Sequence, residues 1–131
     1  MDSQSRPIVL CVDDEDSQLT LRKILFEEAG FEFLGVQSGT EALKLFRARD
    51  VGAVVLDYWM SDMKGTEIAV EMKRQRPNVP IIVLSGFGWL PGEASLVNAW
   101  FQKGRMQPDE LVREVRRLLH HSSDKQQNAT S

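Results

Sequence analysis

The chain has 131 residues, of which 42% are hydrophobic and 27% charged, and its formal net charge at pH 7 is −3. This composition is ordinary for one globular domain with its own core, and the acidic balance argues against a nucleic-acid-binding surface. No apolar run approaches the roughly 20 residues of a membrane-spanning helix, and the polar start MDSQSRP does not suit a secretory signal. We therefore expect a cytoplasmic protein that binds neither membranes nor nucleic acid directly. The lone Cys11 lies in an apolar run, which indicates a buried structural thiol.

The first part of the chain alternates between strand and helix patterns. Residues 8–12 (IVLCV) are continuously apolar, as in a central strand of a parallel sheet that is covered on both faces. A helix is expected next, ending near Gly30. Its expected apolar face consists of Leu21, Ile24, Leu25 and Ala29. Residues 31–36 (FEFLGV) alternate more and suit an edge strand, and the capping box from Ser38 to Glu41 predicts the start of a second helix.

The second part continues the same alternation. Residues 51–56 (VGAVVL) and 79–84 (VPIIVL) predict two more central strands, and a helical pattern separates them. Residues 99–102 (AWFQ) predict a short fifth strand. Only about residues 92–98 remain for a fourth helix, and a helix so short depends on tertiary packing. Residues 108–120 predict the last helix, with proline in its first turn.

Five alternations of strand and helix indicate an α/β fold with a doubly wound, five-stranded parallel sheet. We expect one domain over residues 1–121 and a disordered polar tail over residues 122–131. Right-handed crossovers place the C-terminal ends of all strands at one edge of the sheet, and ligands bind such sheets outside that edge.

Polar residues stand at these strand ends. Asp13 and Asp14 follow the first strand and Asp57 the third, and the two strands are neighbours in a doubly wound sheet of this size. Three carboxylates that share one crevice need a cation among them, and a few hard oxygen ligands with room for water suit Mg²⁺. Ser85 and Lys103 end the fourth and fifth strands at the same edge. Carboxylate, divalent ion, hydroxyl and ammonium together make a site for phosphoryl transfer.

These positions make the sequence similar to the receiver domains of two-component response regulators over about residues 6–120. The similarity rests on Asp13, Asp14, Asp57, Met60, Gly65, Ser85 and Lys103. It implies a flavodoxin-like (βα)5 fold with strand order 2-1-3-4-5, and a chemotaxis-type, single-domain receiver that acts in a phosphorelay. The implied partners are a sensor histidine kinase or phosphotransfer protein and a downstream protein target that the sequence does not name, and a homodimer remains open.

The resemblance also implies a role for each site residue. Asp57 accepts the phosphoryl group, and Asp14 and Asp57 bind Mg²⁺ together with the backbone carbonyl of Trp59, while Asp13 acts largely through water. Ser85 and Lys103 contact the phosphoryl group. Trp100 takes the place of the aromatic switch residue, and the switching surface comprises the loop after the fourth strand, the fourth helix, the fifth strand and the last helix. The bulk of Trp59 beside the phosphoacceptor predicts slow loss of the phosphoryl group.

The sequence departs from the family pattern at several positions. Gly104 stands where these domains usually carry a proline after the lysine, so we expect a trans or a strained peptide there. Ser61 replaces another frequent proline, and the segment between Ser85 and Lys103 is short for the family. The output surface is therefore the part that the resemblance defines least.

Other functions remain open on the sequence alone. A phosphatase of the haloacid dehalogenase class would need an acid two residues after its nucleophile, where this chain has Trp59, so we expect no enzyme activity on other substrates. A third hypothesis keeps the fold as an interaction module that does not use phosphate. Nucleotide or flavin binding is disfavoured, because DDED replaces a glycine-rich loop after the first strand.

Overall fold

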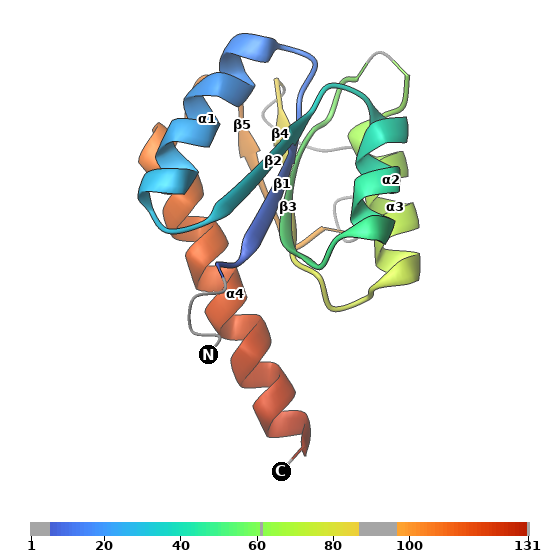
Figure 1. Cartoon of the computed structure of the whole chain (residues 1–131), viewed down its shortest axis with the longest axis vertical. Helices are drawn as coiled ribbons and strands as arrows, with labels where there is room; N and C mark the ends of the chain where they lie inside the picture. Colours follow the sequence, from blue (N-terminus) through green and yellow to red (C-terminus); the bar gives the residue numbers. More distant parts are fainter. Residues whose placement is uncertain (1–5, 61, 87–96, 131) are drawn as a thin grey trace.

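Five parallel strands form one sheet in the order β2-β1-β3-β4-β5. The computed structural model describes residues 6–60, 62–86 and 97–130 (Figure 1). The strands are β1 (Ile8–Val12), β2 (Glu32–Val36), β3 (Val51–Asp57), β4 (Ile81–Ser85) and β5 (Ala99–Gln102). The helices are α1 (Asp16–Glu28), α2 (Gly39–Ala48), α3 (Gly65–Gln75) and α4 (Pro108–Thr130). The predicted fold class, strand order and edge position of β2 are confirmed.

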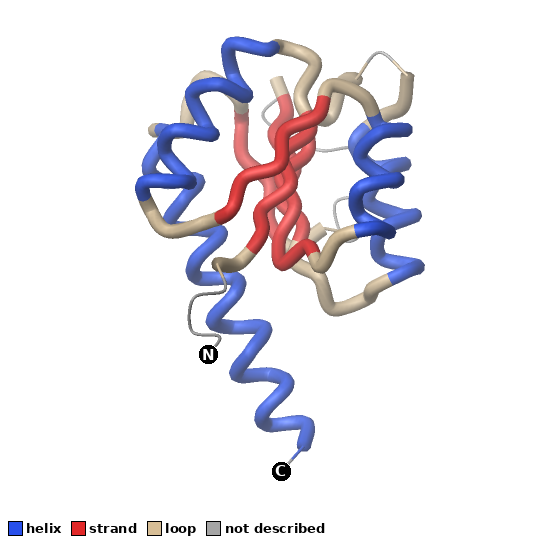
Figure 2. Tube along the Cα trace, viewed as in Figure 1, coloured by secondary structure: helices blue, strands red, loops and turns tan. Residues whose placement is uncertain are grey.

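Helices cover both faces of the sheet, with α1 and α4 on one side and α2 and α3 on the other (Figures 1 and 2). Each face has its own apolar core, because side chains alternate along a strand. Val9 and Cys11 of β1 belong to the core under α1 and α4, whereas Leu10 and Val12 belong to the core under α2 and α3. The continuous apolar pattern of the central strands therefore reflects burial on both faces.

The short strand β5 is attached to β4 by the residue that precedes it. The side-chain oxygen of Asn98 accepts a hydrogen bond from the Ile81 N–H at 2.9 Å, and the Asn98 N–H donates to the Ile81 carbonyl at 2.9 Å. Lys73 of α3 donates to the same Asn98 oxygen at 2.7 Å. The fourth helix predicted at residues 92–98 falls mostly on residues outside those described, while Val97 and Asn98 belong to no helix.

The last helix extends further than predicted. It begins at Pro108, as expected, but it continues to Thr130, whereas the sequence predicts an unstructured tail from residue 122. Once a helix has formed, each added residue contributes one further backbone hydrogen bond, so a helix can continue into a polar segment. The last turns of α4 extend away from the sheet (Figure 1). The domain boundary at residue 121 stays a prediction.

The buried face of α1 differs from the predicted one. Leu21 and Ile24 are 43% and 52% exposed, whereas Leu19, Arg22 and Phe26 are buried. Apolar residues occur all along this helix, so their spacing permits more than one buried face. The structure resolves the ambiguity by burying the charged Arg22, which has a partner beneath the helix. The predicted face is wrong for Leu21 and Ile24, while Leu25 and Ala29 are partly buried against the core.

Two further expectations concern Cys11 and the peptide after Lys103. The Cys11 thiol is buried, so the expectation of a buried thiol is confirmed, and burial raises its pKa to about 12. None of the described residues follows a cis peptide bond, so the Lys103–Gly104 peptide is trans. Gly104 has φ 83°, a left-handed conformation that favours glycine at this turn. Among the described helices, none has the length and apolar character needed to cross a membrane.

Candidate phosphoryl-transfer site

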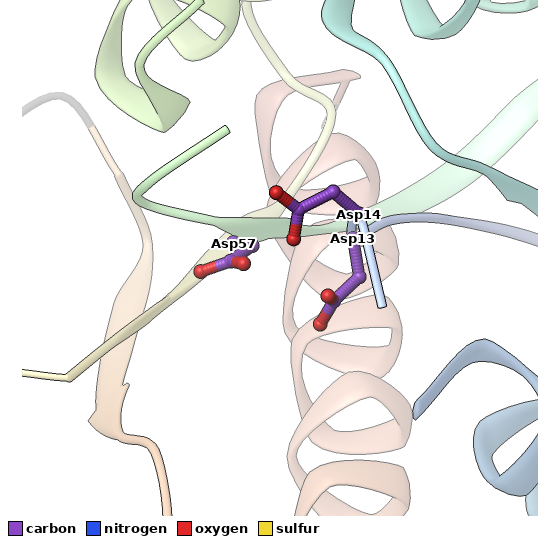
Figure 3. A group of neighbouring side chains, drawn as sticks. All are labelled: Asp13, Asp14 and Asp57. Carbon is purple, nitrogen blue, oxygen red and sulfur yellow. The ribbon is translucent and has the colours of Figure 1, made fainter. Parts of the chain in front are cut away.

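Three carboxylates meet at the C-terminal edge of the sheet. Asp13 and Asp14 follow β1, and Asp57 is the last residue of the neighbouring strand β3. One oxygen from each lies within 4.8 Å of the others, and Figure 3 shows the three side chains next to one another. The expectation that these strand ends meet is therefore confirmed, because adjacent parallel strands end on the same edge.

Asp57 is a buried carboxylate at the paired end of β3. It lies opposite Leu84 in the β3–β4 register, and the N–H of the next residue, Tyr58, donates to the Leu84 carbonyl at 2.8 Å. Burial raises the pKa of Asp57, and the nearby Asp13 raises it further. Lys103 and the Trp59 N–H act in the opposite direction, since both stabilise the ionised carboxylate, but burial prevails.

Lys103 connects the carboxylates of two strands. Its Nζ lies 3.1 Å from Asp57 Oδ2, 3.4 Å from Asp13 Oδ2 and 3.7 Å from Glu15 Oε1. Burial on its own would lower the pKa of Lys103, but the Asp57 and Asp13 carboxylates outweigh burial and raise it. The Lys103 N–H also donates to the Ser85 carbonyl at 2.6 Å, which holds the end of β5 against the end of β4. The side chain is thus a charged ammonium at the centre of the acidic pocket.

Asp13 is completely buried and binds donors through both oxygens. Its Oδ1 accepts from the Glu15 N–H at 2.9 Å, and its Oδ2 accepts from Arg22 Nη1 at 3.0 Å. The sequence did not indicate a site role for Arg22, because the buried face of this helix was predicted from its apolar residues alone. The available signal was a pair of basic residues between Leu21 and Ile24, on a helix that begins two residues after Asp14.

The remaining predicted site residues lie around this pocket. Asp14 is exposed, and Ser85 is the fully buried last residue of β4, one position beyond the partner of Asp57 in the register. Trp59 is 49% exposed. Its ring lies edge-on to the Tyr58 ring, with 4.9 Å between the two ring centroids, and Lys64 Nζ lies 5.7 Å from the centroid of the Trp59 ring. The roles of the Trp59 carbonyl and the Ser85 hydroxyl stay predictions.

Trp100 lies on β5, opposite Val83, and is partly buried against the core under α2 and α3. Its neighbour Phe101 packs on the opposite face of the sheet, in the core under α1 and α4. Trp100 therefore links the strand that precedes Lys103 to the α2 and α3 side of the domain. Its role as a switch residue stays a prediction.

The loop after Asp57 is attached to two helices. The Asp62 carboxylate accepts hydrogen bonds from the N–H groups of Gly39 and Thr40 at 2.9 and 3.1 Å and from Thr40 Oγ1 at 3.0 Å. These bonds lower the pKa of Asp62, with the Gly39 N–H contributing most. The Gly65 N–H, at the start of α3, donates to the Tyr58 carbonyl at 2.7 Å. Sequence reasoning missed Asp62, because its partners are more than 20 residues away along the chain.

Comparisons with known proteins agree with this geometry. The sequence pattern of the family described as the response regulator receiver domain matches residues 9–100. The chain is 35% identical over 82 residues to an NtrX-like protein of Rickettsia bellii, covering 61% of this chain and 17% of that protein. It is 28% identical over 113 residues to the autoinducer 1 sensor kinase/phosphatase LuxN of Vibrio harveyi, covering 86% of this chain and 13% of LuxN. The chain thus spans less than a fifth of these relatives.

Solved structures show the same fold. The response regulator TrrA of Thermotoga maritima, solved with Mg²⁺ and BeF, is 29% identical, with a TM-score of 0.79, and the match covers 86% of this chain and 98% of TrrA. A CheY-like receiver domain of Methanospirillum hungatei superposes with a TM-score of 0.85 at 22% identity, covering 92% of this chain and 99% of that one. The chain belongs to the response regulator receiver domain family, a class of phosphorylation-dependent signalling modules in two-component systems.

Proposed function

We propose that this domain is a signalling receiver that takes a phosphoryl group onto Asp57 from a phosphohistidine of a sensor kinase or phosphotransfer protein. The observation that carries the proposal is the pairing of the buried Asp57 carboxylate with Lys103 at 3.1 Å, beside the other two acids. An Asp57 oxygen would attack the phosphorus in line, so that an O–P bond forms as the P–N bond to the donor histidine breaks. Asp57 is suited to this because burial limits its hydration.

The carboxylate cluster fits a magnesium ion. Its three oxygens lie within 4.8 Å of one another, and hard oxygen ligands with room for water are what Mg²⁺ prefers. Asp14, Asp57 and the Trp59 carbonyl would hold the ion, with Asp13 acting through water. When bound, the ion would offset the charge on the oxygens of the transferred group. TrrA, which has the same fold, was solved with Mg²⁺.

Lys103 and Ser85 would bind the phosphoryl group once it is on Asp57. Phosphorylation adds about −1.5 to −2 charge at one point, which attracts an ammonium that already lies at this carboxylate. Lys103 N–H donates to the Ser85 carbonyl, so the backbones that carry these two residues are joined and would move together. The loop after β4, with β5 and Trp100, would then carry the change to a protein partner.

One experiment tests the proposal directly. The protein is incubated with Mg²⁺ and acetyl phosphate, and separately with a phosphorylated kinase, and its intact mass is then measured. We expect the mass increase of one phosphoryl group for the wild-type protein, and no increase for Asp57→Asn or in the absence of Mg²⁺. If neither donor modifies the wild-type protein, or if Asp57→Asn is modified equally, the proposal is wrong.

A second candidate is an interaction module that works without phosphorylation. It is favoured by the fact that protein cations, Lys103 and Arg22, already pair with Asp57 and Asp13. A Mg²⁺ titration separates the two functions. A receiver should gain thermal stability with millimolar Mg²⁺, because a ligand that binds only the folded state stabilises it. No response in melting temperature and no change in tryptophan emission would favour the interaction module.

A further inference from the structure

Arg22 is a buried cation to which the proposed receiver function assigns no role. It lies on α1 with 7% of its surface exposed, and its Nη1 is 3.0 Å from Oδ2 of the fully buried Asp13. Charged residues are rarely so buried without a partner, and here the partner is an acid of the candidate site. The neighbouring Lys23 differs, since its side chain is 56% exposed and it pairs with Glu27 on the same helix.

The contacts of Asp13 limit what else this carboxylate can bind. It accepts the Glu15 N–H on Oδ1 and the Arg22 guanidinium on Oδ2, and Lys103 Nζ approaches Oδ2 at 3.4 Å. A carboxylate has about four lone-pair positions, so little capacity remains for direct coordination of a cation. Arg22 therefore competes for Asp13 Oδ2 with the water through which this carboxylate would reach a divalent ion.

The charge of Arg22 also changes the balance of the pocket. The three carboxylates and Glu15, whose Oε1 lies 3.7 Å from Lys103 Nζ, carry four negative charges, and Lys103 with Arg22 carries two positive ones. The pocket is left with two net negative charges, where Lys103 alone would leave three. A less negative pocket attracts a dication less strongly.

We propose that Arg22 sets the affinity of the acidic pocket for Mg²⁺, weakening it by holding Asp13 and by cancelling one of the pocket's negative charges. This inference rests on the proposed receiver function. Arg22 is a positioning residue, because it acts through Asp13 and has no place at the reacting phosphorus. Removal of its charge should therefore change how much Mg²⁺ is needed and leave the rate at saturating Mg²⁺ unchanged.

The test compares the wild-type protein with Arg22→Gln and Arg22→Lys, and uses Lys23→Gln as the matched control. Lys23→Gln removes one positive charge from the same helix without touching the pocket. Mg²⁺ binding is measured by calorimetry at constant ionic strength, and phosphorylation by acetyl phosphate is followed across a Mg²⁺ series. We expect Arg22→Gln to bind Mg²⁺ about tenfold more tightly. Its half-saturating Mg²⁺ concentration should fall equally, with an unchanged maximal rate, and the other two variants should stay within about twofold of wild type.

Several results would overturn the inference. One is an unchanged or weaker Mg²⁺ affinity in folded Arg22→Gln. Another is an equal gain in Mg²⁺ affinity in Lys23→Gln or Arg22→Lys. A third is a lower maximal rate in Arg22→Gln with no change in its half-saturating Mg²⁺ concentration. If Arg22→Gln does not fold, Arg22→Met provides an uncharged chain of similar length for the same measurements. A wild-type protein that neither binds Mg²⁺ nor becomes phosphorylated refutes the proposed function as well, whereas a phosphorylated wild type with an unaltered Arg22→Gln refutes only the role of Arg22.

Discussion

Replacing Gly65 with alanine should disturb the phosphoacceptor directly. An added Cβ would lie 2.6 Å from the Asp57 carbonyl oxygen and 2.9 Å from the Tyr58 Cα. Both are backbone atoms of buried residues, at and directly after the end of β3, so they cannot rotate away as a side chain would. Restoring an ordinary contact of 3.4 Å requires the start of α3 to move by about 0.8 Å, against the 2.7 Å hydrogen bond from Gly65 to Tyr58.

Overpacking of this kind costs about 1–3 kcal/mol, and we expect Gly65→Ala to lose that much unfolding free energy in urea. The displaced Asp57 should also be phosphorylated more slowly by acetyl phosphate, since small errors in the position of a nucleophile reduce rates strongly. The matched control is Gly86→Ala, because a Cβ at Gly86 meets no atom within 4 Å among the described residues. Equal stability and phosphorylation rates for Gly65→Ala and Gly86→Ala would refute this reasoning.

Three further predictions concern side chains of the site. Burial raises the pKa of Asp57 above that of the unfolded chain, so its ionisation costs stability that the protein recovers as pH falls through the folded pKa. Without Mg²⁺, Asp57→Asn should therefore be more stable than wild type at neutral pH, by about 0.5–2 kcal/mol in urea, with a difference that shrinks in acid. A less stable variant at neutral pH would contradict this. Asp62→Ala removes three hydrogen bonds to the start of α2 and should cost about 1 kcal/mol at neutral pH. Because the pKa of Asp62 is lowered, that loss should vanish as pH falls through it, and a loss that is independent of pH would argue against the cap. Trp59→Ala should speed loss of the phosphoryl group several-fold, as followed by mass spectrometry over time, and an unchanged lifetime would remove Trp59 from the path of the attacking water.

The strands and the edge at which the acids meet follow from the sequence. Runs such as residues 8–12 and 51–56 are apolar throughout, and that pattern belongs to strands buried on both faces. The handedness of the crossovers then brings Asp13, Asp14 and Asp57 to one edge without knowledge of any contact between them. These inferences succeeded because they depend on local pattern and on general rules of chain topology.

The contacts that shape the pocket were decided only by the tertiary structure. Periodicity on α1 indicated Leu21 and Ile24 as buried residues, yet both are exposed, and Arg22 lies inward against Asp13. The attachment of Asp62 to the start of α2 likewise joins segments that are distant along the chain. Hydrophobic spacing describes how much apolar surface a helix has to bury. Which charged group is buried depends on whether an oppositely charged residue lies next to it in the fold, and the local sequence around a helix does not show which residue that is.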